Sequence, residues 1–273
     1  MKYKADLHSH STASDGQYSP TELVKLAKNA GVELLALTDH DTMAGTDEAI
    51  RAAEALGGIR VLRGVELGAA DHRYMHIVAL DPDPGDTPLA TLCACLERGR
   101  VERMYRIIDF LKKKGVPVTA EEVEAVAGRT AVGRPHFARV MVAKGYVASV
   151  KEAFDRYLDT REYQSIERIK YAADECIEGI KASGGKAVLA HPYQLGYSHE
   201  EMDRLLKWLK MAGLDAIEVY YRRHTPEQIA EYMAFAKKYD LHISAAGDFH
   251  GPKVHPDDAF HPVEIETDWI FEK

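Results

Sequence analysis

The sequence has few cysteines, no long apolar run and no excess of positive charge. Its three cysteines, Cys93, Cys95 and Cys176, are odd in number and lie in segments with helical patterns, so no disulfide framework is expected. No stretch approaches the roughly 20 apolar residues of a membrane span. The first residues also lack the apolar core of a signal peptide. We therefore expect a cytoplasmic protein that does not enter a membrane.

The charge balance is acidic, with 35 Lys and Arg residues against 43 Asp and Glu residues and a formal net charge of −8. A protein that coats long duplex nucleic acid needs a broad basic surface, so extended duplex is not an expected partner. A small phosphorylated substrate remains compatible with this charge, because bound divalent ions reverse the local sign of the field. Nothing in the sequence indicates an obligate protein partner.

Short apolar strands alternate with amphipathic helical stretches, which is typical of a parallel α/β fold. The predicted strands are 4–7, 34–37, 59–65, 76–80, 187–190, 216–219 and 243–246, with 263–265 as a candidate last strand. Helices are predicted to begin after Ser19, Thr119 and Ser198, each followed three residues later by Glu. The alternation stops at the turn-rich residues 81–88, and residues 89–158 keep only helical spacing. We therefore predict a barrel from residues 1–85 and 166–273 and a helical insertion, residues 86–165, that contributes to substrate binding.

Imidazole and carboxylate side chains lie at the ends of nearly all the predicted strands. The His-x-His spacing of His8 and His10 points both rings the same way. The further candidates are Asp15, His40, Glu66, His76, His191, Asp248 and His250. A single such residue is more often a packed side chain or a helix cap, but strand ends of a parallel barrel meet on one face, so the joint pattern indicates a metal centre. Imidazole and carboxylate without thiolate suit two or three Mn²⁺, Zn²⁺ or Fe²⁺ ions.

These motifs resemble those of the PHP (polymerase and histidinol phosphatase) superfamily. They read Asp6-Leu7-His8-Ser9-His10, Thr38-Asp39-His40-Asp41, Gly64-Val65-Glu66, Ala190-His191-Pro192 and Gly247-Asp248-Phe249-His250, and they span residues 6–250. The resemblance implies a distorted (β/α)7 TIM-like barrel and three ligand sets. The first is His8, His10, Glu66 and Asp248; the second shares Glu66 and adds His76 and His191; the third is Asp15, His40 and His250. Asp15 stands where several family members have histidine.

The insertion also carries a resemblance. Residues 133–139, Gly-Arg-Pro-His-Phe-Ala-Arg, followed by Gly145-Tyr146-Val147, are similar to stand-alone phosphoesterases that act on 3′,5′-nucleotide bisphosphates, some of which trim short RNA from its 5′ end. This implies hydrolysis of the 3′-phosphate by metal-hydroxide attack, with Mn²⁺ as the expected ion. Arg134 is the expected phosphate contact, since guanidinium binds phosphate in a bidentate way. His136 is either a second contact or a helix-packing residue.

Three further residues follow the strand that ends near position 219. Arg222, Arg223 and His224 are candidate contacts to a second phosphate, although exposed loop arginines are common. Asp15, His191 and His250 are the candidates that orient or supply the proton of the leaving group.

Three alternatives share the same residues. A histidinol-phosphate phosphatase would use the same metal face, but the insertion with Arg134 argues against it. A catalytically silent PHP module beside a polymerase is disfavoured by the full ligand set. An amidohydrolase acting on a carbonyl would commonly have a lysine-derived bridging ligand, and no lysine ends a strand at the corresponding place.

Overall fold

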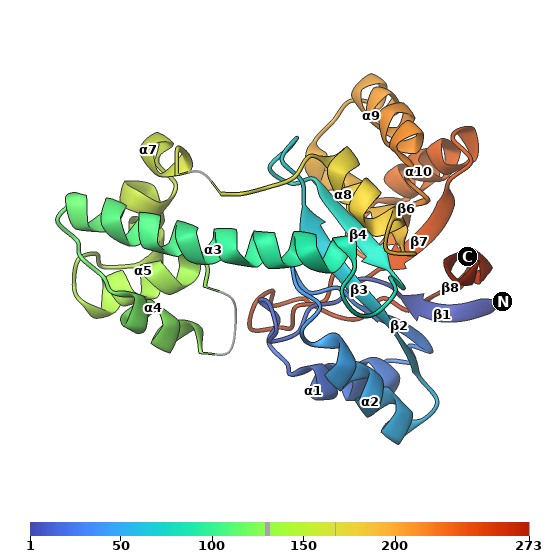
Figure 1. Ribbon diagram of the computed structural model, residues 1–273, viewed down its shortest axis with the longest axis horizontal. Coiled ribbons are helices and arrows are strands. Elements are labelled where there is room, and N and C mark those ends of the chain that lie inside the picture. The colour runs from blue at the N-terminus through green and yellow to red at the C-terminus, as the bar shows by residue number, and fades with distance from the viewer. Residues whose placement is uncertain (129–131, 167, 273) are drawn as a thin grey trace. The chain divides into compact units, whose positions relative to one another are not determined.

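The computed structural model describes residues 1–128, 132–166 and 168–272 and divides into two compact units (Figure 1). The first comprises residues 1–93 and 170–273, and the second comprises residues 94–169. The helical insertion was predicted over residues 86–165. Helix α3 (Pro88–Lys113) crosses the first boundary because its opening turns pack with the first unit, where Leu89 and Leu92 are buried.

The first unit is built on one sheet of eight strands that is nearly closed into a barrel. The strands are β1 (Lys2–Asp6), β2 (Leu34–Leu37), β3 (Arg60–Gly68), β4 (His76–Leu80), β5 (Lys186–Leu189), β6 (Ala216–Tyr221), β7 (His242–Ala246) and β8 (Val263–Glu266). Their order is β7-β6-β5-β4-β3-β2-β1-β8. Leu7, just past β1, donates its N–H to the carbonyl of Ala245 in β7 at 2.8 Å, which brings the two ends of the sheet together. The prediction of an α/β TIM-like barrel is confirmed.

Two strands run against the others, so the expectation of a parallel sheet was wrong for them. β4 is antiparallel to both β3 and β5, and β8 is antiparallel to β1. Residues 69–75 between β3 and β4 are too few for the crossover that a parallel pair requires. The reversal places the start of β4 opposite the end of β3, with His76 in register with Gly68. His76 therefore lies at the same end of the barrel as the ligands that follow the parallel strands.

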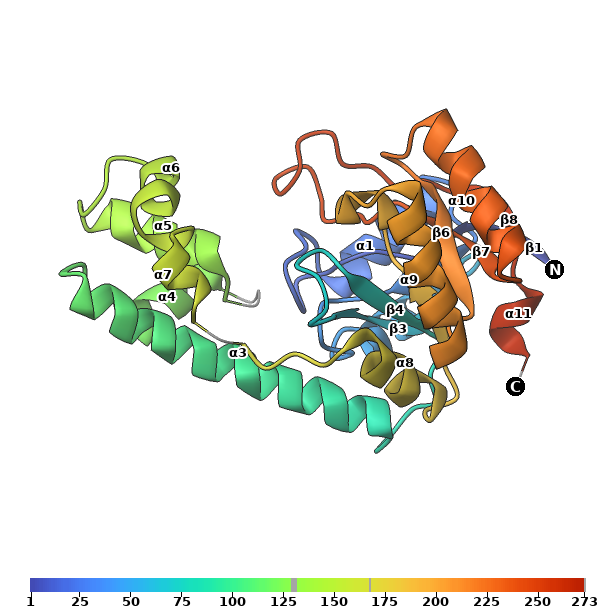
Figure 2. The ribbon, with the colours of Figure 1, turned by 90° about the horizontal axis from the view of Figure 1, so that it is seen from above.

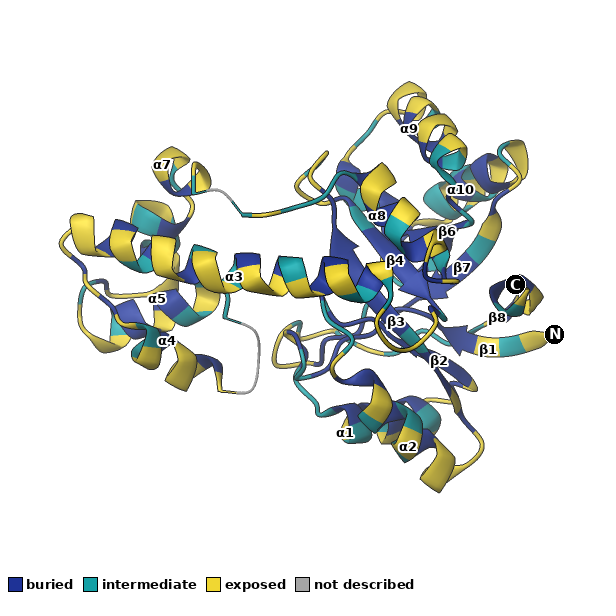
Figure 3. Ribbon diagram, viewed as in Figure 1, coloured by how far each residue is buried: buried dark blue, intermediate teal, exposed yellow. Residues whose placement is uncertain are grey.

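Helices cover the outside of the barrel, and the central strands β2 to β6 are its most buried elements (Figure 3). They are α1 (Pro20–Asn29), α2 (Thr46–Leu56), α8 (Ala173–Lys181), α9 (His199–Ala212) and α10 (Pro226–Lys238), with a short 3-10 helix, η2 (Pro192–Leu195), and the terminal α11 (Asp268–Phe271). The predicted capping boxes form at Ser19 and Ser198, where each hydroxyl accepts the N–H of the glutamate three residues on. Leu23 and Val24 of α1 pack with Leu35 and Leu37 of β2.

The second unit is made of helices (Figure 2) and has its own hydrophobic core. After α3 it contains α4 (Ala120–Ala127), α5 (Arg134–Ala143), α6 (Val150–Ala153), the π-helix η1 (Phe154–Leu158) and α7 (Arg161–Gln164). Phe137, Met141 and Leu158 are buried together there. No strand occurs among its described residues. Across the described part of the chain, no helix combines the length and apolarity that a membrane crossing requires.

Candidate metal centre

The predicted ligands meet at one end of the barrel. His8 and His10 follow β1, and the loops after β1 and β2 are held by isolated bridges, Ser9 to Phe249 and His40 to Glu66. The side chains of His8, His10, Glu66 and His191 are at most 2% exposed. The barrel therefore gathers histidines and carboxylates from six strands into one site, whose innermost ligands are shielded from solvent.

Glu66 is at the centre of the cluster. Its Oε1 lies 2.6 Å from Nδ1 of His76 and 3.0 Å from Nε2 of His191. Its Oε2 lies 2.7 Å from Nδ1 of His40 and 3.4 Å from Nε2 of His10. A carboxylate with both oxygens turned to different imidazoles has the arrangement of a bridging ligand between two ions.

A second carboxylate faces His8 and His10 from the end of β7. Oδ1 of Asp248 lies 3.6 Å from Nε2 of His8 and 3.3 Å from Nε2 of His10. Both Nε2 atoms are buried and have no hydrogen-bond partner among the described residues. Buried polar atoms are nearly always paired, so nitrogens that converge with carboxylates in this way fit a cation held between them.

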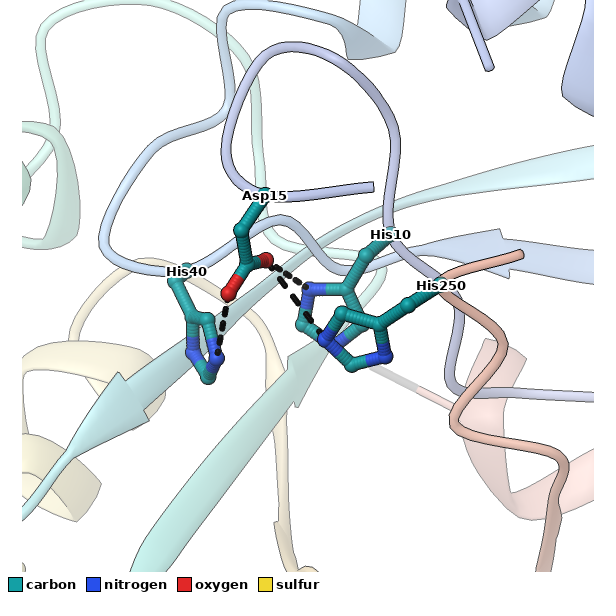
Figure 4. Close-up of side chains that lie close together, drawn as sticks. All are labelled: His10, Asp15, His40 and His250. Carbon is teal, nitrogen blue, oxygen red and sulfur yellow. Dashed lines mark ion pairs between the residues drawn. The ribbon is translucent and has the colours of Figure 1, made fainter. Parts of the chain in front are cut away.

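A third group lies at the more exposed edge of the site (Figure 4). The carboxylate of Asp15 points among three rings, with its oxygens 3.7 Å from Nδ1 of His10, 3.7 Å from Nε2 of His40 and 3.5 Å from Nε2 of His250. His10 thus faces this group through Nδ1 and Glu66 through Nε2. The resemblance had placed His10 in the first ligand set only.

The electrostatics of the cluster follow from its burial and its dense charge. Burial would raise the pKa of Glu66 and Asp248, but the surrounding histidines hold both pKa values well below the usual range. Burial and the neighbouring His250 lower the pKa of His10 to about 3. His250 itself has a pKa raised to about 10, because Asp15 and Asp248 outweigh the effect of burial. Without bound ions, His8 and His250 are therefore protonated, and their positive charges partly neutralise the carboxylates.

Several residues that support the site were not predicted. Asp39 accepts hydrogen bonds from the Ser11 N–H at 2.7 Å and from the Ser14 hydroxyl at 2.6 Å, and so holds the loop that carries Asp15. Two residues of β6 contact ligands on the side away from the site: Glu218 contacts His8, and Tyr221 contacts Asp248. A carboxylate in the middle of a strand has no sequence signal that distinguishes it from an ordinary surface acid, so only the three-dimensional contact identifies it.

The three predicted substrate contacts after β6 differ in their surroundings. Arg222 donates from Nε to the Gly247 carbonyl at 2.9 Å and forms an ion pair with Asp258 at 2.6 Å, so it braces the loop after β7. His224 is buried, with Nδ1 2.9 Å from the Val219 carbonyl. Arg223 is exposed. Of the three, Arg223 has the side chain that is accessible to a ligand.

Arg134 lines a cavity of about 230 Å³ within the helical unit. Three more arginines line it, Arg100, Arg103 and Arg168, together with Tyr163, which is 1% exposed. Arg134 also forms an ion pair with Asp159 at 3.2 Å. The sequence does not reveal this grouping, because its members come from α3, α5 and the segment after α7. Nδ1 of His136 accepts the Gly133 N–H at 2.9 Å, which caps the start of α5.

Comparisons with known proteins show the family to which the chain is similar. Residues 6–252 match the family model described as PHP domain. The chain is 38% identical over 253 residues to the 5′-3′ exoribonuclease of Haemophilus influenzae, with 92% of each chain covered. It is 32% identical over 262 residues to the 3′,5′-nucleoside bisphosphate phosphatase of Chromobacterium violaceum, covering 95% of this chain and 92% of that one. A solved structure from Bifidobacterium adolescentis, provisionally named a metal-dependent phosphoesterase, matches with a TM-score of 0.79 and 31% identity over 98% of this chain and 94% of that one.

Proposed function

The chain belongs to the PHP domain family, and from this membership we propose that it is a metal-dependent phosphoesterase whose substrates are phosphorylated nucleotides. The observation that carries the proposal is the position of Glu66, whose two oxygens face imidazoles from several strands. We propose the 3′-phosphate of 3′,5′-nucleotide bisphosphates as the group that is removed, since a relative of nearly equal length is named for that activity.

The ligands proposed for the ions are those that converge at the barrel end. They are His8, His10, Glu66 and Asp248 for one ion, Glu66, His76 and His191 for another, and Asp15, His40 and His250 for a third. A neutral imidazole ligates through one nitrogen, so His10 is assigned to the first ion through Nε2. Divalent ions bound there would supply an activated water at neutral pH and neutralise charge on the phosphate oxygens. We propose Mn²⁺, because hard carboxylates and imidazoles without thiolate suit it.

The leaving alcohol needs a proton, and the exposure of the candidates separates them. The side chain of Asp15 is 46% exposed, whereas that of His191 is 2% exposed and its Nε2 already faces Glu66 and His76. His250 lies beside Asp15 at 3.5 Å. We therefore favour the Asp15 and His250 pair over His191: when no third ion is bound, His250 holds the proton and Asp15 orients its ring.

The arginine-lined cavity supports a substrate with a second phosphate. A phosphate dianion is matched by planar guanidinium groups that donate two hydrogen bonds each. Arg100, Arg103, Arg134 and Arg168 supply this donor type around one cavity. We propose that this cavity binds the phosphate that is not hydrolysed. Histidinol phosphate has no such second group, which makes it the less suitable substrate.

Steady-state kinetics with two substrates test this assignment. Adenosine 3′,5′-bisphosphate and 3′-AMP share the scissile phosphate, but 3′-AMP lacks the 5′-phosphate. Arg134→Ala should lower kcat/KM for the bisphosphate about 10- to 100-fold, as expected when a charged hydrogen bond is lost, and leave 3′-AMP unchanged. Arg139→Ala, on an exposed position of the same helix, is the matched control. An equal loss on both substrates would contradict the proposed phosphate contact.

Short RNA with a 5′-phosphate is a second candidate substrate, because a relative at 38% identity is named an exoribonuclease. A panel of the bisphosphate, histidinol phosphate and a short 5′-phosphorylated RNA separates the cases. Preference for histidinol phosphate would be consistent with the proposed metal centre but would refute the proposal that the substrate is a nucleotide. No turnover of any of them with metal bound would favour a silent PHP module. The cytoplasmic location predicted from the sequence stays a prediction.

A further inference from the structure

Strand β6 carries none of the predicted metal ligands, yet two of its polar side chains are buried against the site. Glu218 is 1% exposed and Tyr221 is 2% exposed. Neither belongs to a motif that singles out the metal centre. Their contacts show what these buried polar groups do.

Glu218 joins two ligands that come from different strands. Its Oε1 lies 2.7 Å from Nδ1 of His8, and its Oε2 accepts the backbone N–H of His191 at 2.5 Å. Because Nδ1 of His8 is occupied by Glu218, Nε2 of the same ring faces Glu66 and Asp248, at 3.3 Å and 3.6 Å. A carboxylate on the far nitrogen of a ligating histidine fixes the ring and its tautomer and raises its basicity.

The chemistry of this position requires a carboxylate. Both partners, Nδ1–H of His8 and N–H of His191, are donors, so the side chain must offer two acceptor oxygens. A glutamine has one acceptor oxygen and one NH₂ group, so it loses one contact whichever way its amide turns. His191 also has a backbone φ of 27°, a conformation that non-glycine residues rarely adopt, and its N–H is held by Glu218.

Tyr221 acts on the other carboxylate of the site. Its hydroxyl donates to Oδ2 of Asp248 at 3.0 Å, which leaves Oδ1 turned toward His8 and His10. Strict alternation along a strand would send residues 218 and 221 to opposite faces. The pairing of β6 with β7 has a register shift between Glu218 and Tyr220, and a bulge of this kind re-aims the residues that follow it.

We propose that β6 positions the ligands of the metal centre. Its positioning residues are Glu218, which holds His8 and His191, and Tyr221, which holds Asp248, in their ligating orientation. This inference rests on the metal-dependent function proposed above. It assigns to β6 a role in metal affinity that is separate from any contact with substrate.

The test is Mn²⁺ affinity of the metal-stripped protein, measured by competition with a chelating dye and without substrate. Glu218→Gln keeps the side-chain volume and should weaken Mn²⁺ binding about 10- to 100-fold, the range found when outer partners of metal ligands are removed. Tyr221→Phe should weaken it in the same direction. Tyr220→Phe, on the neighbouring position of the same strand, is the matched control and should bind as wild type does.

Unfolding of the metal-stripped variants separates positioning from a merely structural role. If Glu218→Gln and Tyr221→Phe lower the unfolding midpoint but keep wild-type Mn²⁺ affinity, the proposal is overturned. If Glu218→Gln does not fold, Tyr221→Phe decides alone. A wild type that binds Mn²⁺ but releases no phosphate would refute the proposed function and leave the role of β6 standing. A wild type that binds no Mn²⁺ would refute both.

Discussion

Replacing Glu66 by glutamine removes the charge at the centre of the cluster while keeping the side-chain volume. In the wild type, the carboxylate oxygens of Glu66 lie within 3.4 Å of imidazole nitrogens of His8, His10, His40, His76 and His191. A neutral amide cannot bridge two cations, so Glu66→Gln should lose the ions that share it. The readout is the stabilisation that Mn²⁺ gives to the folded protein.

The magnitude follows from mass action. Free Mn²⁺ at 100 times its dissociation constant stabilises the native state by about 2.7 kcal/mol for one site. For a unit of this size, about 1 kcal/mol shifts the unfolding midpoint by roughly 2–4 °C. Chelation should therefore lower the wild-type midpoint by about 5–10 °C for one ion, and by more if two ions are lost. In Glu66→Gln the shift should be smaller than in the wild type by at least this one-ion amount, because only an ion on Asp15, His40 and His250 would be retained.

The assay is thermal unfolding followed by circular dichroism, with Mn²⁺ and after chelation, for each protein separately. Breaking a buried charge cluster also destabilises the metal-free protein by about 3–5 kcal/mol, and the comparison within each protein cancels this loss. Glu54→Gln, at an exposed position of α2, is the control and should shift as the wild type does. A chelation shift in Glu66→Gln equal to that of the wild type would refute Glu66 as a ligand.

Three more predictions concern pH and the supporting structure. Mn²⁺ affinity should rise between pH 6.5 and 8.5, by about tenfold per pH unit for each proton that the ion displaces. The reason is that His250, whose pKa is raised to about 10, and His8, whose pKa lies well above its usual value, are protonated in the metal-free protein. An affinity independent of pH would contradict this. The metal-free protein should lose stability as pH falls below about 4.5, since the folded pKa values of Glu66 and Asp248 lie well below their unfolded values; urea unfolding at pH 3 and pH 6 measures it, and a higher stability at pH 3 would be inconsistent. Phe137→Ala should destabilise the helical unit by about 3–5 kcal/mol, because the Phe137 ring is buried in that unit's own core. The same change should leave Mn²⁺ affinity unchanged. A fall in affinity would show that the metal centre depends on that core.

The sequence was sufficient for elements whose signals are local. β2 and β4 begin and end as predicted, since each contains a short apolar run, 34–37 and 77–80, that is followed by a polar residue. The hydroxyl and glutamate pairs at Ser19, Thr119 and Ser198 form the expected capping boxes. Ligand types at successive strand ends likewise have local signals, which is why their convergence could be expected from the amino-acid sequence alone.

Features that depend on contacts between distant parts of the chain could not be predicted. Glu218 meets His8 across 210 residues of chain, and no spacing rule links them. Arg100, Arg103 and Arg168 join Arg134 only through the packing of the helical unit. In each case the prediction would need the contacts between segments that are far apart in the sequence, and these are known only from the folded structure.

Release of inorganic phosphate from adenosine 3′,5′-bisphosphate by the wild-type protein, stripped of metal and then reloaded with Mn²⁺, tests the central claim most directly. We expect release to stop on stripping and to return on reloading, with 5′-AMP as the other product. Equal release by the stripped protein, or no release from the protein with Mn²⁺ bound, would contradict a metal-dependent phosphoesterase acting on nucleotide bisphosphates.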